Sequence, residues 1–249
     1  KLRDLLDSPE SGSANLARDA LFELDAKNPV SAEMEEPLYS AKYLTKKYED
    51  LLVKMAHDRD SGLDSAVDLM YELLHRHDSG ATIVFPSAFM ANTVIGALKN
   101  RAHTGDAQKA HNLLLNLEKR YREGQDVARP MAIAYNLCAE AWGKDKSRDI
   151  HEKAISVMNR KWAMSQDFND DTLKPDSECF LPLFRACARV SDIQDEEISK
   201  SSSAPFSVAV QLLGKMISTG IKPNHSTYGY MFLLGLRDEW KKNDPRRLA

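Results

Sequence analysis

The chain has 249 residues, a formal net charge of −3 and an apolar fraction of 43%, which is enough to bury a core. Glycine (11) and proline (10) are sparse, while Ala, Leu, Lys, Glu and Asp are common, as is typical of helical proteins. No apolar run reaches the roughly 18 residues that a membrane span needs. Three cysteines are too few for a disulfide framework or a four-ligand zinc site. The excess of acidic residues argues mildly against a dedicated nucleic-acid binder.

Two helices are expected in the first part of the chain. The opening stretch KLRDLLD has the composition of a helix, and residues 13–28, SANLARDALFELDAKN, carry apolar residues at helical spacing. The second stretch has the pattern of the second helix in a helical hairpin whose first helix is partly lost. We therefore assign residues 1–37 to a partial amino-terminal repeat.

Prolines in similar settings punctuate the rest of the chain at intervals of 49, 44, 45 and 48 residues. They are Pro37, Pro86, Pro130, Pro175 and Pro223. Each proline is followed by about fifteen residues with apolar positions at helical spacing, which we name an A helix. Because proline lacks a backbone N–H and fixes φ, it ends one helix and sets up the next.

A second helical pattern, which we name a B helix, follows each A helix. The B helices are expected at residues 63–77, 105–121, 148–162 and 204–220. Each has an alanine near its start: Ala66, Ala110, Ala154 and Ala209. A small residue at a helix crossing allows close approach, and larger apolar residues fill the space around it. Since one hairpin cannot bury its apolar face alone, we predict an all-α protein built as an α-solenoid of stacked helix-turn-helix repeats.

The repeat array is expected to cover residues 38–249. Its units span about 38–86, 87–130, 131–175 and 176–223, followed by a partial unit at 224–249. Two stretches interrupt the regular pattern: residues 164–175, MSQDFNDDTLKP, lengthen the loop after the third B helix, and a second stretch lies inside the fourth of these units. Residues 191–205, SDIQDEEISKSSSAP, are acidic and then serine-rich, which predicts a mobile surface loop and a candidate modification site.

Around the prolines the sequence resembles the pentatricopeptide repeat, in which a turn G-[IV]-x-P-[DN] leads into x-T-Y-N-x-L-I. The last turn, GIKPNHSTYGYM, is a close match. The other turns match in part through RPMAIAYNLCAEAWGK, FPSAFMANTVIGAL and KPDSECFLPLF. The resemblance covers about residues 38–249, although the units here are longer than the usual pentatricopeptide unit of about 35 residues. The tetratricopeptide repeat, a peptide-binding hairpin array, matches less well because its W-x-x-L-G-x-x-Y pattern is absent.

The resemblance implies binding of single-stranded RNA, usually one base per repeat, through two or three side chains of each unit. One base-contacting position follows the A-helix tyrosine and holds Asn92, Asn136, Leu181 and Gly229. A second follows the turn proline and holds Ser87, Met131, Asp176 and Asn224. The position that would pack against a base face holds Phe89, Ile133, Glu178 and Ser226.

Six of these residues are the predicted RNA contacts: Asn92, Asn136, Asp176, Asn224, Phe89 and Ile133. The pair of Asn136 with Asp176 resembles a uracil-type combination of the family, since an amide offers a donor and an acceptor and a carboxylate sets its orientation. Leu181 and Gly229 offer no side-chain hydrogen bond, so their units would contact a base weakly. Three basic clusters are candidates for phosphate contacts. They are Lys42, Lys46 and Lys47; Lys119, Arg120 and Arg122; and Lys241, Lys242, Arg246 and Arg247.

Two functions from different classes follow. The resemblance implies a helical-repeat RNA-binding protein of organellar RNA metabolism, in a mitochondrion or chloroplast. The alternative is a protein–protein scaffold, a structural subunit of a larger organellar assembly such as a ribosome, and the long units and acidic balance favour it. Neither function calls for an enzyme, a cofactor, a small-molecule substrate or a metal. The stretch DFNDDTLKPDSE imitates a calcium loop but has Thr172 where a glycine is needed, and no Walker or dinucleotide-binding loop occurs.

Overall fold

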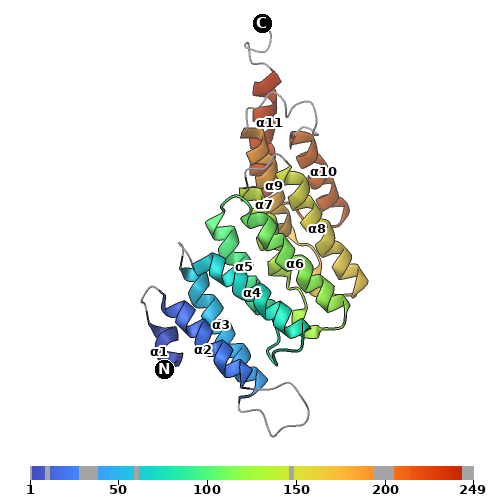
Figure 1. The fold of residues 1–249 in the computed structure, drawn as a ribbon. Coiled ribbons are helices and arrows are strands. Elements are labelled where there is room, and N and C mark those ends of the chain that lie inside the picture. The colour runs from blue at the N-terminus through green and yellow to red at the C-terminus, as the bar shows by residue number, and fades with distance from the viewer. Residues whose placement is uncertain are drawn as a thin grey trace. The chain divides into compact units, whose positions relative to one another are not determined.

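The structure is a computed structural model that describes residues 2–8, 12–27, 39–58, 62–145, 149–192 and 205–242. These residues form helices and turns and contain no strand, which confirms the all-α prediction for this part of the chain. The α-helices, drawn in Figure 1, are α1 (Leu2–Asp7), α2 (Ser13–Ala26), α3 (Ala41–His57), α4 (Gly62–Asp78), α5 (Ala88–Arg101), α6 (Asp106–Arg122), α7 (Ala132–Lys144), α8 (Ile150–Asp167), α9 (Ser177–Asp192), α10 (Pro205–Ser218) and α11 (His225–Lys242). Two short 3₁₀ helices are η1 (Asp126–Ala128) and η2 (Asp171–Leu173).

The chain forms two compact units. The first contains residues 1–101 and 112–130, and the second contains residues 102–111 and 131–249. Helix α6 therefore contributes its first turns to the second unit and the remainder to the first. The described A helices are α3, α5, α7, α9 and α11, and the B helices are α4, α6, α8 and α10.

The four predicted B helices all exist. Helices α4 and α6 begin and end within one residue of the predicted bounds, whereas α8 continues to Asp167, five residues beyond its predicted end. The alanines predicted at helix crossings are fully buried: Ala66, Ala110, Ala154 and Ala209. Residues 193–204, which make up most of the predicted acidic and serine-rich loop, lie outside the described residues.

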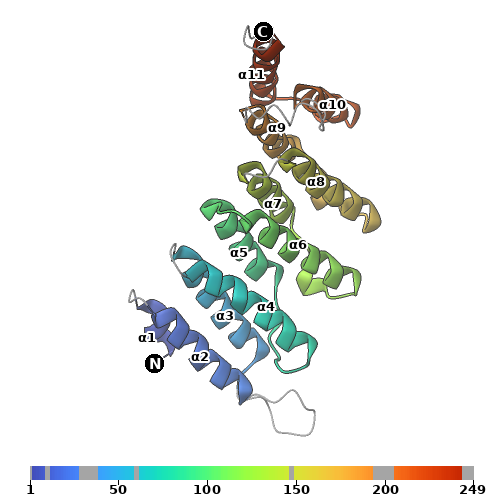
Figure 2. The ribbon, with the colours of Figure 1, turned by 45° about the horizontal axis from the view of Figure 1, so that its top comes forward.

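The principal helix–helix contacts within each unit join helices one or two places apart in the sequence. In the first unit, α3 packs against α2, α4 and α5. In the second unit, α9 packs against α7, α8, α10 and α11, and Figure 2 shows α7, α9 and α11 following one another. Helices α3, α7 and α9 thus each contact both their own B helix and the next A helix of the same unit.

The turn after each B helix repeats one local structure. The helix is followed by a residue with positive φ, at Gly80, Gly124, Asn169 and Gly220. In all four turns the N–H of this residue donates to the carbonyl three residues earlier, and the next N–H donates to the carbonyl five residues before itself, over 2.8–3.3 Å. These two bonds define a Schellman motif, in which glycine, or sometimes asparagine, adopts the left-handed conformation.

The length from the positive-φ residue to the following proline differs among these turns. It is three residues in the last turn, Gly220 to Pro223, and six residues in the three earlier turns. Each longer turn buries an apolar side chain two residues before its proline: Val84, Ala128 and Leu173. The long spacing of the predicted units therefore arises in part from three additional residues in these turns, which are anchored by burial.

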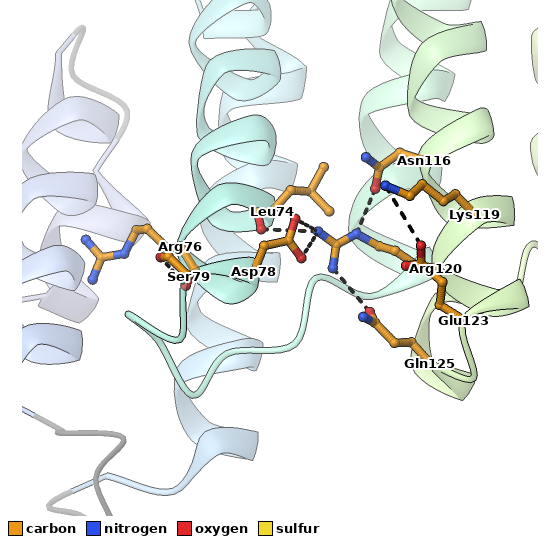
Figure 3. A network of polar contacts seen from close by, with 9 residues as sticks. All are labelled: Leu74, Arg76, Asp78, Ser79, Asn116, Lys119, Arg120, Glu123 and Gln125. Carbon is orange, nitrogen blue, oxygen red and sulfur yellow. Dashed lines mark hydrogen bonds and ion pairs between the residues drawn. The ribbon is translucent and has the colours of Figure 1, made fainter.

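A buried arginine joins two B helices of the first unit (Figure 3). The side chain of Arg120 on α6 is only 4% exposed, and its Nη2 donates to both carboxylate oxygens of Asp78 at 2.6 Å. Its remaining N–H groups reach the Leu74 carbonyl at 3.1 Å, Asn116 Oδ1 at 2.8 Å and Gln125 Oε1 at 3.1 Å. Since every nitrogen has an acceptor, the guanidinium is satisfied within the protein.

A buried carboxylate makes a second such link in the same unit. The Asp25 side chain on α2 is 0% exposed and accepts from Thr82 Oγ1 at 2.9 Å, Arg76 Nη2 at 3.2 Å and Tyr48 Oη at 3.4 Å. These donors come from α3, α4 and the turn after α4. The cost of burying a charge is thus offset by three donors, one of them cationic.

Candidate nucleic-acid interface

The predicted base-contacting residues that follow the turn prolines are the N-caps of the A helices. Asp176 Oδ1 accepts from the Cys179 N–H and Asn224 Oδ1 from the Thr227 N–H, both at 3.0 Å, and Ser87 Oγ accepts from the Met90 N–H at 3.3 Å. Met131 occupies the same place before α7 without a side-chain cap. The sequence alone explains Asp, Asn and Ser here, because these residues satisfy the free N–H groups at a helix start.

The predicted stacking residues lie at one register on their helices. Phe89 is two residues past its N-cap on α5, in the first unit, and Ile133 is two residues past its N-cap on α7, in the second. Their exposed fractions are 49% and 51%, so each presents apolar surface to solvent. Asn92 and Asn136, three residues further along the same helices, are half-buried.

The structure brings Asn136 and Asp176 into one chain of polar contacts within the second unit. Lys161 of α8 donates from Nζ to Asn136 Oδ1 at 3.4 Å and to Cys179 Sγ at 2.7 Å. The Cys179 thiol in turn donates to Asp176 Oδ1 at 3.0 Å. Lys161 is 1% exposed and Cys179 is fully buried, so these two residues support the predicted base-contacting pair from inside the protein.

The protonation states in this cluster follow from burial and hydrogen bonding. Partial burial alone would raise the pKa of the Asp176 carboxyl, but hydrogen bonds from the Cys179 thiol and N–H outweigh it and hold the pKa below its usual range. Burial raises the pKa of the Cys179 thiol, and the hydrogen bonds from the Asp176 N–H and from Lys161 oppose this increase only in part. Asp176 is therefore an anionic acceptor at neutral pH, and Cys179 is a protonated donor.

A basic pocket, not predicted from the sequence, lies on the A helices of the second unit. Its basic lining residues are Lys144 from α7, Arg185 and Arg189 from α9, and Arg237 from α11. Tyr230 accepts from Arg185 Nε at 3.1 Å, and Arg237 Nη1 donates to the Ala188 carbonyl at 2.9 Å. Among the described lining residues Glu140 is the one that is acidic, so these residues together carry an excess of positive charge.

Three of these basic residues occupy equivalent places in successive A helices. Lys144, Arg189 and Arg237 each lie 13 residues after the N-cap of their helix, and eight residues after Asn136, Leu181 and Gly229, respectively. Their separation in the sequence is 45 and 48 residues, the same as that of the prolines. The repeated spacing of these basic residues in the sequence is enough to predict the pocket, because basic residues at one repeat register line one face of adjacent helices.

The basic clusters suggested by the sequence have other surroundings. Arg120 is buried and bound to Asp78, so it is not available for phosphate; its neighbour Lys119 is 74% exposed and lies 3.8 Å from Glu123. Lys46 and Lys47 pair with Asp50 on α3 at 3.3 and 3.5 Å. The side chains of the last cluster, Lys241, Lys242, Arg246 and Arg247, lie outside the described residues.

The calcium-like stretch forms a turn and two helix starts. Asp170 accepts from the N–H and the hydroxyl of Thr172 at 3.0 and 2.7 Å, and Asp176 caps α9. Throughout the described ranges, no three His, Cys, Asp or Glu side chains are grouped to hold a metal ion. None of the helices in those ranges combines the length and apolar character needed to cross a lipid bilayer.

Comparison of the chain with protein-family models and with curated proteins finds no match. The resemblance to the pentatricopeptide repeat thus depends on the turn and A-helix residues themselves.

Proposed function

We propose that this chain is a pentatricopeptide-like helical-repeat protein whose A helices bind single-stranded RNA in a mitochondrion or chloroplast. The observation that carries the proposal is the basic pocket formed by α7, α9 and α11, because phosphate groups are the part of RNA that basic side chains neutralise. The hairpins would stack as an α-solenoid, so that consecutive A helices offer their equivalent positions to consecutive nucleotides.

The register of the A helices supports this arrangement. Asn136 and Lys144 lie on the same helix eight residues apart, which is about 12 Å along its axis. Leu181 with Arg189 and Gly229 with Arg237 repeat this spacing on α9 and α11. One helix would therefore hold a base at Asn136 or its equivalent and a backbone phosphate near Lys144 or its equivalent.

Binding is expected to depend mainly on the phosphates. Asn136 with Asp176 is a polar base-contacting pair, whereas Leu181 and Gly229 provide no side-chain hydrogen bond at the equivalent position. Sequence preference should therefore be confined to about one base in the second unit. Salt sensitivity, in contrast, should be pronounced because it follows the number of phosphate contacts.

The double variant Arg185→Ala/Arg189→Ala is expected to weaken RNA binding and its salt dependence. Both side chains are exposed, so their removal should leave the fold intact. Each lost phosphate contact should reduce the slope of log K against log salt by about 0.7 for a single strand. Fluorescence anisotropy with labelled random single-stranded RNA, titrated at several salt concentrations, measures both quantities.

A matched control is Lys46→Ala/Lys119→Ala, which removes the same charge from lysines already paired with carboxylates. The control should retain the salt slope of the unmodified protein. An equal loss in both double variants would mean that overall charge, and not the pocket, determines binding. If the unmodified protein shows no salt-sensitive binding at micromolar concentration, the proposed function is wrong.

The variant Asn136→Leu/Asp176→Asn is expected to lose preference for uracil while retaining most of the affinity. Leucine reproduces the side chain found at the equivalent position of the next unit, and asparagine keeps a good N-cap for α9. Competition of labelled RNA with uridine-rich and adenosine-rich oligonucleotides measures the preference. An unchanged preference would assign Asn136 and Asp176 to the fold alone.

A protein–protein scaffold is the second candidate function, and one observation favours it. Three apolar side chains at one face of α11 are exposed: Tyr228 by 56%, Phe232 by 70% and Leu236 by 51%. The residues of the same register on α9 are buried: Phe180, Phe184 and Ala188. An apolar face of this kind fits a helical protein partner, and the RNA titration distinguishes the two functions because a scaffold shows no salt-sensitive RNA binding.

A further inference from the structure

A lysine and a cysteine of the second unit lie in direct contact in its interior. Lys161 Nζ on α8 is 2.7 Å from Cys179 Sγ on α9. Lys161 is 1% exposed and Cys179 is 0% exposed, so both groups are shielded from bulk solvent. The pair thus places a nucleophilic nitrogen beside a sulfur atom that can be oxidised.

The neighbours of this pair hold it in position. Cys179 is the third residue of α9, and its N–H and thiol both bind the carboxylate of Asp176. Lys161 is also held by Asn136 Oδ1 at 3.4 Å. Asp176 is exposed and Asn136 half-buried, so the cluster lies directly beneath the surface, where a small oxidant needs little structural opening to reach the sulfur.

We propose that Lys161 and Cys179 are a covalent modification site, at which a hydroperoxide oxidant converts the contact into a sulfenamide cross-link. The thiolate of Cys179 attacks one peroxide oxygen, the O–O bond breaks, and sulfenic acid forms while the other oxygen leaves as water or an alcohol. The Lys161 amine then attacks the sulfur, an N–S bond forms, and the S–O bond breaks to release water. Sulfur is oxidised, the peroxide is reduced, and an ammonium proton passes to solvent.

The cross-link would join α8 to α9 and remove the positive charge beside Asn136. It needs no RNA and does not depend on the proposed function. Because burial raises the pKa of the Cys179 thiol, thiolate is scarce at neutral pH. The rate of cross-linking is therefore expected to increase as the pH is raised toward that pKa.

Peptide mass spectrometry of the folded protein, treated with hydrogen peroxide at two pH values, tests the proposal. Trypsin cannot cleave after a modified Lys161, and the Lys174–Pro175 bond resists it, so the cross-linked residues should appear in one peptide from Lys161 to Arg185. That peptide should be lighter by two hydrogen atoms than the unmodified sequence. Further cleavage after Glu178 should leave its two parts joined, whereas a peptide without the cross-link falls into two.

Matched cysteine variants provide the controls. Cys187 is eight residues further along α9 and is equally buried. Cys187→Ser should retain the cross-link, whereas Cys179→Ser and Lys161→Met should lose it. Oxidation of Cys179 to sulfinic acid without a joined peptide, or a joined peptide that keeps the peroxide oxygen, would overturn the sulfenamide assignment.

Discussion

Replacement of Asp25 by alanine is expected to lower the free energy of unfolding by about 3–5 kcal/mol, the cost of removing one partner from a buried ion pair. The side chain of Asp25 is completely buried, and its removal leaves Arg76, Tyr48 and Thr82 without their shared acceptor. Arg76 is 19% exposed at its side chain and cannot recover full hydration by small movements. Urea denaturation followed by far-UV circular dichroism measures the change.

Asp19 on the same helix is the matched control. Its side chain is 62% exposed and pairs with the adjacent Arg18, so Asp19→Ala should change stability by no more than about 0.5 kcal/mol. Combining Asp25→Ala with Arg76→Met should cost less than the sum of the two single changes, since the double variant leaves no unpaired charge. Equal effects at Asp19 and Asp25 would contradict the role of the buried carboxylate.

Replacement of Arg120 by alanine is expected to destabilise the protein by about 3 kcal/mol, the loss of one to two charge-assisted hydrogen bonds in a buried setting. Its carboxylate partner Asp78 is 60% exposed and can be rehydrated, which makes this cost smaller than that at Asp25. Arg120→Lys should recover only part of the loss, because an ammonium group cannot reach Asp78, Asn116 and Gln125 from three separate nitrogens as the guanidinium does (Figure 3).

Lys119, the preceding residue, provides the comparison for Arg120. Its charge is the same, but its side chain is 74% exposed, so Lys119→Ala should leave the urea midpoint almost unchanged. A similar shift in the midpoint for both variants would show that the net charge of α6, rather than the Arg120 contacts, governs stability.

The helices of this protein could be predicted because each local signal agreed with the global pattern. Proline before each A helix, alanine at each B-helix crossing and apolar residues at helical spacing all depend on short-range physics. The length of the turns could not be predicted in this way. Val84, Ala128 and Leu173 are fully buried in their turns, and burial of a turn residue is a property of the folded structure that local sequence signals do not show.

Site residues were predicted less completely than helices. A solvated basic cluster and a buried guanidinium have the same appearance in a sequence. Arg120 stands next to Lys119 in the chain, whereas its partner Asp78 is 42 residues away. The burial of Lys161 cannot be predicted from its place in a B helix, because a lysine there is normally exposed. Lys144, Arg189 and Arg237 could have been found, because aligning the units on their N-caps places all three at one register.

The principal helix contacts within each unit join near neighbours in the sequence, and this has a kinetic consequence. Few pairs of distant residues must meet before contacts begin to form, so loop-closure entropy opposes folding only weakly and each unit should fold rapidly. Because helices such as α9 pack against several others of the same unit, opening within a unit should begin at the helices that have fewer such contacts. Amide hydrogen exchange should therefore show graded protection along the chain, with the slowest amides in helices such as α3 and α9 that have neighbours on several sides.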